Sequence, residues 1–241
     1  MLTHTLHQRV LRSALASKLA YEYKPLYTER KHPQNKGILR IQTPGMIALT
    51  TGDNNLLVAF KGSTTIDDVA TFFKVAPKEF RYREAVVQVH GGVLDMFRNT
   101  HGPLETVLPS KSLLINTSHR PLITFTGHSQ GGSLAMFASA YYGSMYHNNV
   151  DIICHTFGTP RVGNDAFHNW HANYTIESIN VIHSGDVVSR FPMGYGYVAN
   201  PNQKVVDVGY CAKGEKKCND VLSQHNMDMY LDSIRLWNGP G

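Results

Sequence analysis

Hydrophobic and polar positions along the chain alternate between a helical period of 3.6 residues and a strand period of two. Apolar residues recur at helical spacing over residues 8–22, which predicts an N-terminal helix. Apolar runs bounded by turn residues predict strands at 38–41, 45–50, 56–60, 85–90, 121–126, 150–157, 178–183 and 204–210. Helical patterns lie at 65–75, 91–100, 104–116, 132–147, 162–174 and 226–236.

The order of these elements predicts the fold class. Strands that alternate with helices form a mostly parallel central sheet with helices on both faces, which is the α/β class. The strands at 45–50 and 56–60 flank the turn residues 51–55 and indicate a hairpin, so we expect an N-terminal antiparallel addition to that sheet. The 241 residues contain no repeat, low-complexity tract or linker, and we expect one domain over residues 1–241.

One segment combines a strand, a sharp turn and a helix. The strand at 122–126 runs into Gly127-His128-Ser129-Gln130-Gly131, and a helical stretch follows. This order is typical of the nucleophile elbow of α/β-hydrolases, in which a strained turn raises a serine above the sheet edge. We expect Ser129 to be the nucleophile. Gly127 and Gly131 fit this turn, because Cβ atoms at these two positions would collide.

A serine hydroxyl is a weak nucleophile that needs a base, and the base needs an orienting carboxylate. In α/β-hydrolases the chain order is serine, acid, histidine, so the partners should follow residue 129. Asp186 follows the strand at 178–183 through a short turn, and His225 is the only histidine beyond it. Three other acids fit less well: Asp165 resembles a helix cap, Asp151 begins a strand and Asp207 lies within one. We therefore predict a triad of Ser129, Asp186 and His225.

An oxyanion formed at the serine needs two backbone N–H donors. We expect one from Gln130, the residue after the nucleophile, and one from Ser63, in the turn after the strand at 56–60. The following segment, residues 64–80, has an apolar helical face, which fits either a lid over an apolar cleft or a plain surface helix.

Five segments in this order resemble the class 3, or fungal-type, triacylglycerol lipases. They are Ala59-Phe60-Lys61-Gly62-Ser63, Val89-His90-Gly91-Gly92-Val93, Gly127-His128-Ser129-Gln130-Gly131-Gly132, Thr156-Phe157-Gly158-Thr159-Pro160-Arg161-Val162-Gly163-Asn164, and Asp186-Val187-Val188 with Arg190-Phe191-Pro192. The resemblance covers about residues 40–230. It implies an α/β-hydrolase fold, the triad and oxyanion residues named above, and hydrolysis of acyl-glycerol esters without a metal or cofactor.

Two positions depart from that family. Gln130 stands where the family usually has leucine, and Asp68-Val69 stands where it usually has Asp-Trp. The backbone N–H at 130 is unaffected by its side chain, so we expect catalysis to survive the first change. The change at Asp68-Val69 affects the expected geometry of a lid and the expected class of substrate.

The distribution of charged residues along the chain limits the kinds of molecule that we expect it to bind. Residues 1–40 contain eight Lys and Arg against two acids, and the rest of the chain is close to neutral. A solvated helix face explains this excess, and weak attraction to an anionic lipid interface is the alternative. The basic residues are dispersed and no reading motif accompanies them, so nucleic-acid binding is not expected. No apolar run reaches the length of a transmembrane segment.

The compartment stays open at this level. Residues 1–20 lack a clean apolar block, so we expect no signal peptide and a cytoplasmic or otherwise intracellular chain as numbered; removal of a leader would make it secreted. Three cysteines match no metal pattern. Cys154 lies in an apolar run and should be buried, and Cys211 and Cys218 either close a small loop or remain free thiols.

Three functions are compatible with these residues. The first is a serine ester hydrolase acting on acyl-glycerol lipids, with Phe191, Tyr195 and Tyr197 as candidates to line an acyl groove. The second is a phospholipase or a soluble-ester esterase with the same triad. The third is a non-catalytic binding protein on a lipase-like fold.

Overall fold

The computed structural model of the chain describes residues 4–22, 41–43, 45–50, 55–65, 68, 72–109, 120–146, 149–208 and 223–237. Its centre is a seven-stranded sheet in the order β1-β2-β3-β6-β7-β8-β9. The strands are β1 (Ile41–Thr43), β2 (Met46–Thr50), β3 (Leu56–Phe60), β6 (Leu122–His128), β7 (Asp151–Phe157), β8 (Glu177–Ile182) and β9 (Lys204–Asp207). The first three pair antiparallel, and every pair from β3 to β9 is parallel. The predicted mostly parallel sheet with an N-terminal antiparallel addition is confirmed.

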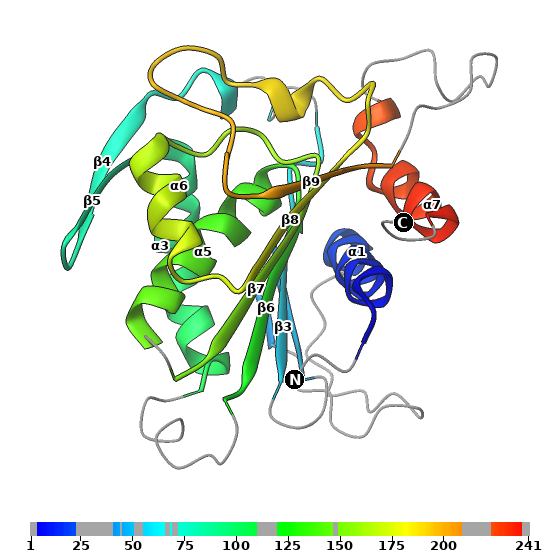
Figure 1. Cartoon of the computed structure of the whole chain (residues 1–241), viewed down its shortest axis with the longest axis horizontal. Helices are drawn as coiled ribbons and strands as arrows, with labels where there is room; N and C mark the ends of the chain where they lie inside the picture. Colours follow the sequence, from blue (N-terminus) through cyan, green and yellow to red (C-terminus); the bar gives the residue numbers. More distant parts are fainter. Residues whose placement is uncertain are drawn as a thin grey trace.

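Helices cover both faces of this sheet (Figure 1). Helices α1 (Leu6–Glu22) and α7 (Met227–Leu236) pack together on one side, and α3 (Gly91–Val107), α5 (Gln130–Tyr146) and α6 (Asp165–Ala172) lie on the other. Two strands, β4 (Pro77–Tyr82) and β5 (Ala85–His90), form a separate antiparallel sheet outside the second helix layer (Figure 1).

The alternation of side chains along β3 explains why its sequence is apolar throughout. Leu56, Val58 and Phe60 pack in the core on the α3 and α5 side. Leu57 and Ala59 point the other way, into a smaller cluster with alanines of α1. A strand buried on both faces loses the polar half of the usual alternation.

Strand β4 is absent from the sequence prediction, which assigned no strand to residues 77–82. Its residues Lys78, Glu79 and Arg81 are exposed, so the segment lacks the apolar run of a buried strand. The aromatic ring of Phe80 holds it to the molecule by packing against Phe137 at 5.0 Å between centroids. Pairing with β5 and the packing of Phe80 therefore override weak local propensity.

The prediction of two helices at 91–100 and 104–116 is wrong at their junction. Residues 91–107 form one helix, α3, that runs through Pro103. Proline removes one backbone hydrogen bond from a helix interior. Phe97 and Leu104 are buried on either side of it in the same core, and this packing offsets the loss.

Some predictions fall on residues outside the described ranges. These are the turn at 51–54, most of the helical pattern around 66–71, the end of the helix at 110–116, and Cys211 and Cys218. Cys154 is a buried free thiol, and burial raises its pKa to about 12.

A partly buried ionic cluster attaches α1 to the sheet. Arg9 donates to Glu177 of β8, with 3.0 Å from Nε to Oε1, and His155 Nε2 donates to the same carboxylate at 2.7 Å. The other nitrogen of His155 is bonded to the Ser13 hydroxyl at 2.9 Å. Burial raises the pKa of Glu177, but the hydrogen bonds from His155 and Arg9 outweigh it and lower that pKa to about 2. Part of the N-terminal basic excess therefore forms internal ion pairs.

Glu177→Gln is expected to lower the free energy of unfolding at pH 7 by about 2 kcal/mol, because the Arg9 charge stays part-buried without its partner. A depressed carboxyl pKa stabilises the fold above its ordinary value of 4.5 and loses that contribution as the pH falls toward 2. The difference between wild type and variant should therefore shrink between about pH 4.5 and pH 2 in urea unfolding. Asp228→Asn, which breaks the exposed Lys18–Asp228 pair, should change stability by less than about 0.5 kcal/mol. Equal stability of wild type and Glu177→Gln at pH 7 would refute this role.

Candidate active site

Ser129 occupies the sharp turn between β6 and α5. Its φ is 58°, in the left-handed region that a residue with a side chain adopts at a cost on the order of 1–3 kcal/mol. A Cβ at Gly127 would overlap the backbone of Gly131, and one at Gly131 would overlap the carbonyl of Phe60. Both glycines are thus required by close backbone approach, as the motif predicts. The Ser129 N–H donates to Phe157 O at 2.9 Å, which fastens the turn to β7.

The three residues predicted as a triad lie together in hydrogen-bonding order. His225 Nε2 is 2.8 Å from Ser129 Oγ, and His225 Nδ1 is 2.7 Å from Asp186 Oδ2. Ser129 and Asp186 are each 1% exposed and His225 is 8% exposed. The three come from the elbow, the loop after β8 and the short helix η3 (Ser223–His225), which all lie at one edge of the sheet.

The carboxylate of Asp186 is held by donors on both oxygens. The Val188 N–H donates to Oδ1 at 2.8 Å, and the Tyr230 hydroxyl donates to Oδ2 at 2.6 Å. Burial, and then the neighbouring Asp186 charge, raise the pKa of Tyr230 well above its usual value, so this phenol stays a donor. The sequence prediction missed Tyr230, which reads there only as an apolar position of the last helix.

His128, the variable position of the elbow motif, lies beside the catalytic histidine candidate. The ring centroids of His128 and His225 are 4.6 Å apart. Burial, and then the proximity of His225, lower the pKa of His128 well below its usual value. Tyr21 of α1 donates to His128 Nδ1 at 2.8 Å. A neutral His128 places no positive charge against the ring of His225.

The residues predicted to bind an oxyanion flank Ser129. Gln130 is the first residue of α5, so its N–H has no acceptor within the helix. A Cβ at Gly62 would meet the Tyr21 hydroxyl and come within 3.0 Å of Ser129 Cβ, so this loop backbone lies against the nucleophile. Ser63 follows, and its buried hydroxyl has no hydrogen-bond partner among the described residues.

The Gln130 side chain has a partner of its own. Its Nε2 donates to the carbonyl of Asp68 at 3.2 Å. A leucine at this position could not make that contact. Gln130, which replaces the usual leucine of the family, therefore contacts Asp68, which belongs to the other position that departs from the family pattern.

Aromatic residues anchor the end of this segment. The ring of Phe72 stacks on His90 at 3.8 Å between centroids, and His90 Nε2 donates to Phe72 O at 2.8 Å. Burial lowers the pKa of His90 to about 4, so the ring is neutral above that pH. Phe73 packs against Phe191 at 5.5 Å, and the Tyr197 hydroxyl donates to Val75 O at 3.0 Å. The loop at 191–197, predicted to line an acyl groove, thus lies against residues 72–75.

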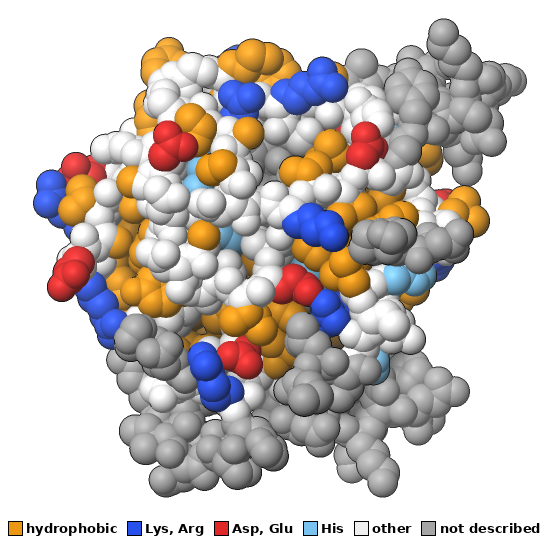
Figure 2. Space-filling view, in the orientation of Figure 1, with side chains coloured by type: hydrophobic (Ala, Val, Ile, Leu, Met, Phe, Trp, Pro, Cys, Tyr) orange, Lys and Arg blue, Asp and Glu red, His pale blue; other side chains and the backbone are white. Residues whose placement is uncertain are grey.

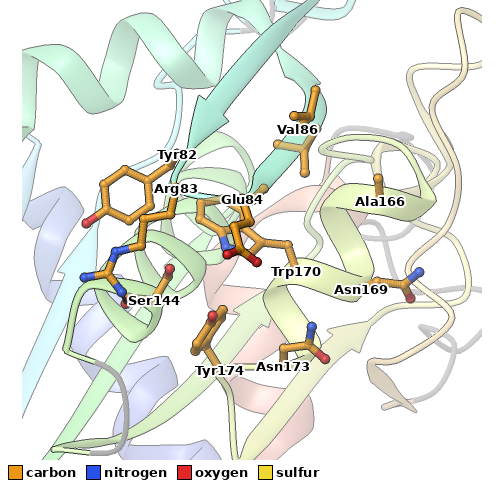
Figure 3. A pocket seen from close by; sticks show the side chains of 12 residues that line it. Tyr82, Arg83, Glu84, Val86, Ser144, Ala166, Asn169, Trp170, Asn173 and Tyr174 are labelled. Atoms are coloured by element: carbon orange, nitrogen blue, oxygen red, sulfur yellow. Dashed lines mark hydrogen bonds between the residues drawn. The ribbon is translucent and has the colours of Figure 1, made fainter.

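A hollow of about 540 Å³ lies between the β4–β5 turn and α6. Figure 3 shows Tyr82, Arg83 and Glu84 on one side and Trp170 with Asn173 on the other. None of the predicted triad or oxyanion residues lines it. This hollow is therefore separate from the candidate catalytic residues.

The described residues offer neither a metal site nor a membrane-spanning helix. No group of three or more His, Cys, Asp or Glu side chains there is arranged to hold a metal ion. None of the helices seen in the described part of the chain is long and apolar enough to cross a membrane.

The sheet and its elbow define an α/β-hydrolase. The model of the family Lipase (class 3) matches residues 57–195, and the chain belongs to the class 3 lipase family. Among solved structures, the nonglycosylated LIP2 lipase of Yarrowia lipolytica has a TM-score of 0.62 at 19% identity, covering 92% of each chain. That likeness confirms the α/β-hydrolase fold.

Curated relatives act on different lipids. The chain is 28% identical over 183 residues to secreted mono- and diacylglycerol lipase 1 of Fusarium solani, which covers 73% of this chain and 53% of that protein. It is 27% identical over 165 residues to the chloroplastic phospholipase A1-Igamma1 of Arabidopsis thaliana, which covers 58% of this chain and 32% of that protein. The chain spans about half or less of the length of these two relatives.

Proposed function

We propose that this protein is a serine carboxylic ester hydrolase that acts on acyl-glycerol lipids through an acyl-enzyme intermediate. The observation that carries the proposal is the hydrogen-bonded series Ser129–His225–Asp186. Ser129, Asp186 and His225 follow or connect elements that belong to, or pack on, one seven-stranded sheet, so we also propose that residues 1–241 act as a single domain.

In the proposed reaction, Ser129 Oγ attacks the ester carbonyl and His225 Nε2 takes its proton. The Asp186 carboxylate orients the imidazole and stabilises its positive charge, while Tyr230 and the Val188 N–H keep that carboxylate in place. The N–H groups of Ser63 and Gln130 bind the oxyanion. His225 then protonates the leaving alcohol, and a water deprotonated by the same ring releases the acid.

The lipid substrate is supported by the surface near the triad. Met193 is 59% exposed and Tyr195 is 81% exposed, in a loop that follows the short helix η1 (Val188–Arg190). Figure 2 shows hydrophobic side chains along the upper edge of the molecule, with Lys and Arg side chains beside them. We propose that this loop contacts the lipid interface, since exposed apolar groups next to cations favour an anionic lipid surface.

The substrate is tested by measuring hydrolysis of emulsified triglyceride, phospholipid vesicles and a soluble short-chain ester side by side. We expect the glyceride to be hydrolysed fastest, with a rate increase once the substrate forms an emulsion. A higher rate on phospholipid would favour the phospholipase alternative, to which the chloroplastic relative points. The highest rate on soluble ester, without an interfacial increase, would identify an esterase.

The double substitution Met193→Ser with Tyr195→Ser is expected to lower the rate on emulsified triglyceride about tenfold. Full burial of one apolar side chain contributes about 1.5–3 kcal/mol, and partial coverage of the two side chains at an interface contributes a fraction of that, about 1.4 kcal/mol in total for a tenfold effect. Hydrolysis of a soluble ester should stay within about twofold. Leu236→Ser removes a side chain that is 82% exposed at the end of α7 and serves as the matched control. Equal losses on both substrates would show that the loop contacts the acyl chain and not the interface.

A further inference from the structure

A cavity of about 150 Å³ lies between the loop after β7 and the segment that leads from η1 to β9. None of Ser129, Asp186 or His225 lines it. Its lining includes the apolar side chains of Met136, Ile182 and Val205, here called the apolar wall, and the polar side chains of Arg161, His168 and Asn200, here called the polar wall. At roughly 30 Å³ per water in the liquid, the space suits a ligand of only a few heavy atoms.

The polar wall carries buried atoms that find no hydrogen-bond partner within the described part of the chain. Arg161 Nε and Asn200 Nδ2 are donors of this kind. The N–H of Asn202 donates to Asn200 Oδ1 at 3.0 Å and orients the Asn200 amide. The amide nitrogen, Nδ2, is the atom that has no partner. Unpaired buried donors are costly, and native structures rarely leave them without an acceptor.

Thr159 also lines the cavity, and its buried hydroxyl has no partner among the described residues, whereas Gln203, Asn180 and Ser189 are already hydrogen-bonded. Gln203 Nε2 donates to Thr156 Oγ1 at 3.2 Å, and that hydroxyl lies 3.1 Å from Asn180 Oδ1. No Asp or Glu is among the described lining residues, and Arg161 forms no ion pair with any described carboxylate. The lining itself thus carries no carboxylate, and a described acid outside it, Asp165, acts on the pKa of His168.

His168 contributes an acceptor at the same wall. Its side chain is almost fully buried, and Nε2 donates to Val198 O at 3.2 Å. Burial lowers the pKa of His168, so the ring is neutral and Nδ1 carries a lone pair. A water molecule or a ligand hydroxyl would satisfy Nδ1.

We propose that this cavity binds a short-chain carboxylate. The carboxylate oxygens accept hydrogen bonds from Arg161 Nε and Asn200 Nδ2, and the alkyl chain packs against Met136, Ile182 and Val205. A carboxylate matches the planar, charged donor set, and the apolar wall distinguishes it from inorganic phosphate. The cavity adjoins the loop of Asp186, because Ser189 lines it and donates to the Asp186 carbonyl at 3.3 Å. The proposal does not depend on the hydrolase activity.

The test is calorimetric titration of the full chain with n-butyrate. We expect one site per chain, with equal affinity in wild type and in Ser129→Ala. Arg161→Gln and Asn200→Leu should each weaken binding about tenfold or more, since each removes one donor to a charged group. Arg190→Gln, which removes an exposed arginine outside the lining, should leave the affinity unchanged. The cation n-butylammonium should not bind.

Four results would overturn the proposal. They are no binding of butyrate, binding that Arg161→Gln and Asn200→Leu leave intact, loss of binding in Ser129→Ala, and preference for phosphate over butyrate at the same residues. If Arg161→Gln does not fold, Asn200→Leu decides alone, because residue 200 lies in an irregular loop. A crystal structure that shows only ordered water in the cavity at saturating butyrate would also contradict it.

Discussion

Ser129→Ala is expected to lower kcat for ester hydrolysis by roughly 10⁶-fold. The hydroxyl 2.8 Å from His225 Nε2 is the only group at the elbow that can form the acyl-enzyme. Residual activity should come from binding and the oxyanion donors alone. The measurement is kcat on a soluble ester at saturating concentration, so that loss of interfacial binding does not enter.

Ser133→Ala is the matched control for that substitution. Ser133 lies one turn along α5 and is also buried, and its hydroxyl has no partner among the described residues. Its removal should change kcat by less than about twofold. A Ser129→Ala protein that folds and keeps most of its activity would exclude Ser129 as the nucleophile.

Asp186→Asn is expected to lower kcat by about 10⁴-fold while substrate binding changes little. An amide in this place cannot stabilise the His225 cation, and its NH₂ group opposes one of the donors that now hold the carboxylate. Those donors are the Val188 N–H, the Tyr230 hydroxyl and the imidazole itself. The loss should therefore appear in kcat and not in KM.

Two other aspartates serve as controls for this choice of acid. Asp165 is exposed at the first turn of α6, and Asp151 begins β7. Asp165→Asn and Asp151→Asn should each retain kcat within about twofold. A large loss in either of them, with Asp186→Asn active, would move the acid to another loop.

The hydrogen-bonded arrangement of Ser129, His225 and Asp186 was predictable because few residues satisfied the requirements of a triad. Gly127 and Gly131 fit the motif by leaving room for neighbouring backbone. Chain order then left His225 as the sole base candidate, and a short turn after β8 left Asp186 as the best acid. These requirements depend on local geometry and on sequence order, both of which can be read from residues alone.

The supporting contacts were not predictable, because they join residues far apart in sequence. Tyr230 reads as one more apolar position of α7 until the packing of that helix brings its hydroxyl to Asp186. Tyr21 lies 107 positions before His128, and no periodicity relates them. Strand β4 was missed for a related reason, since the packing of Phe80 and not the local pattern holds it in place.

Activation of Ser129 as a nucleophile can be measured by covalent labelling. The full chain is treated with a fluorophosphonate, and the adduct is located by peptide mass spectrometry. We expect one adduct per chain, on Ser129, formed rapidly in wild type and at least a thousandfold more slowly in His225→Ala. No adduct, an adduct on another residue, or an equal labelling rate without His225 would exclude Ser129 as an activated nucleophile and favour a non-catalytic protein on a lipase fold.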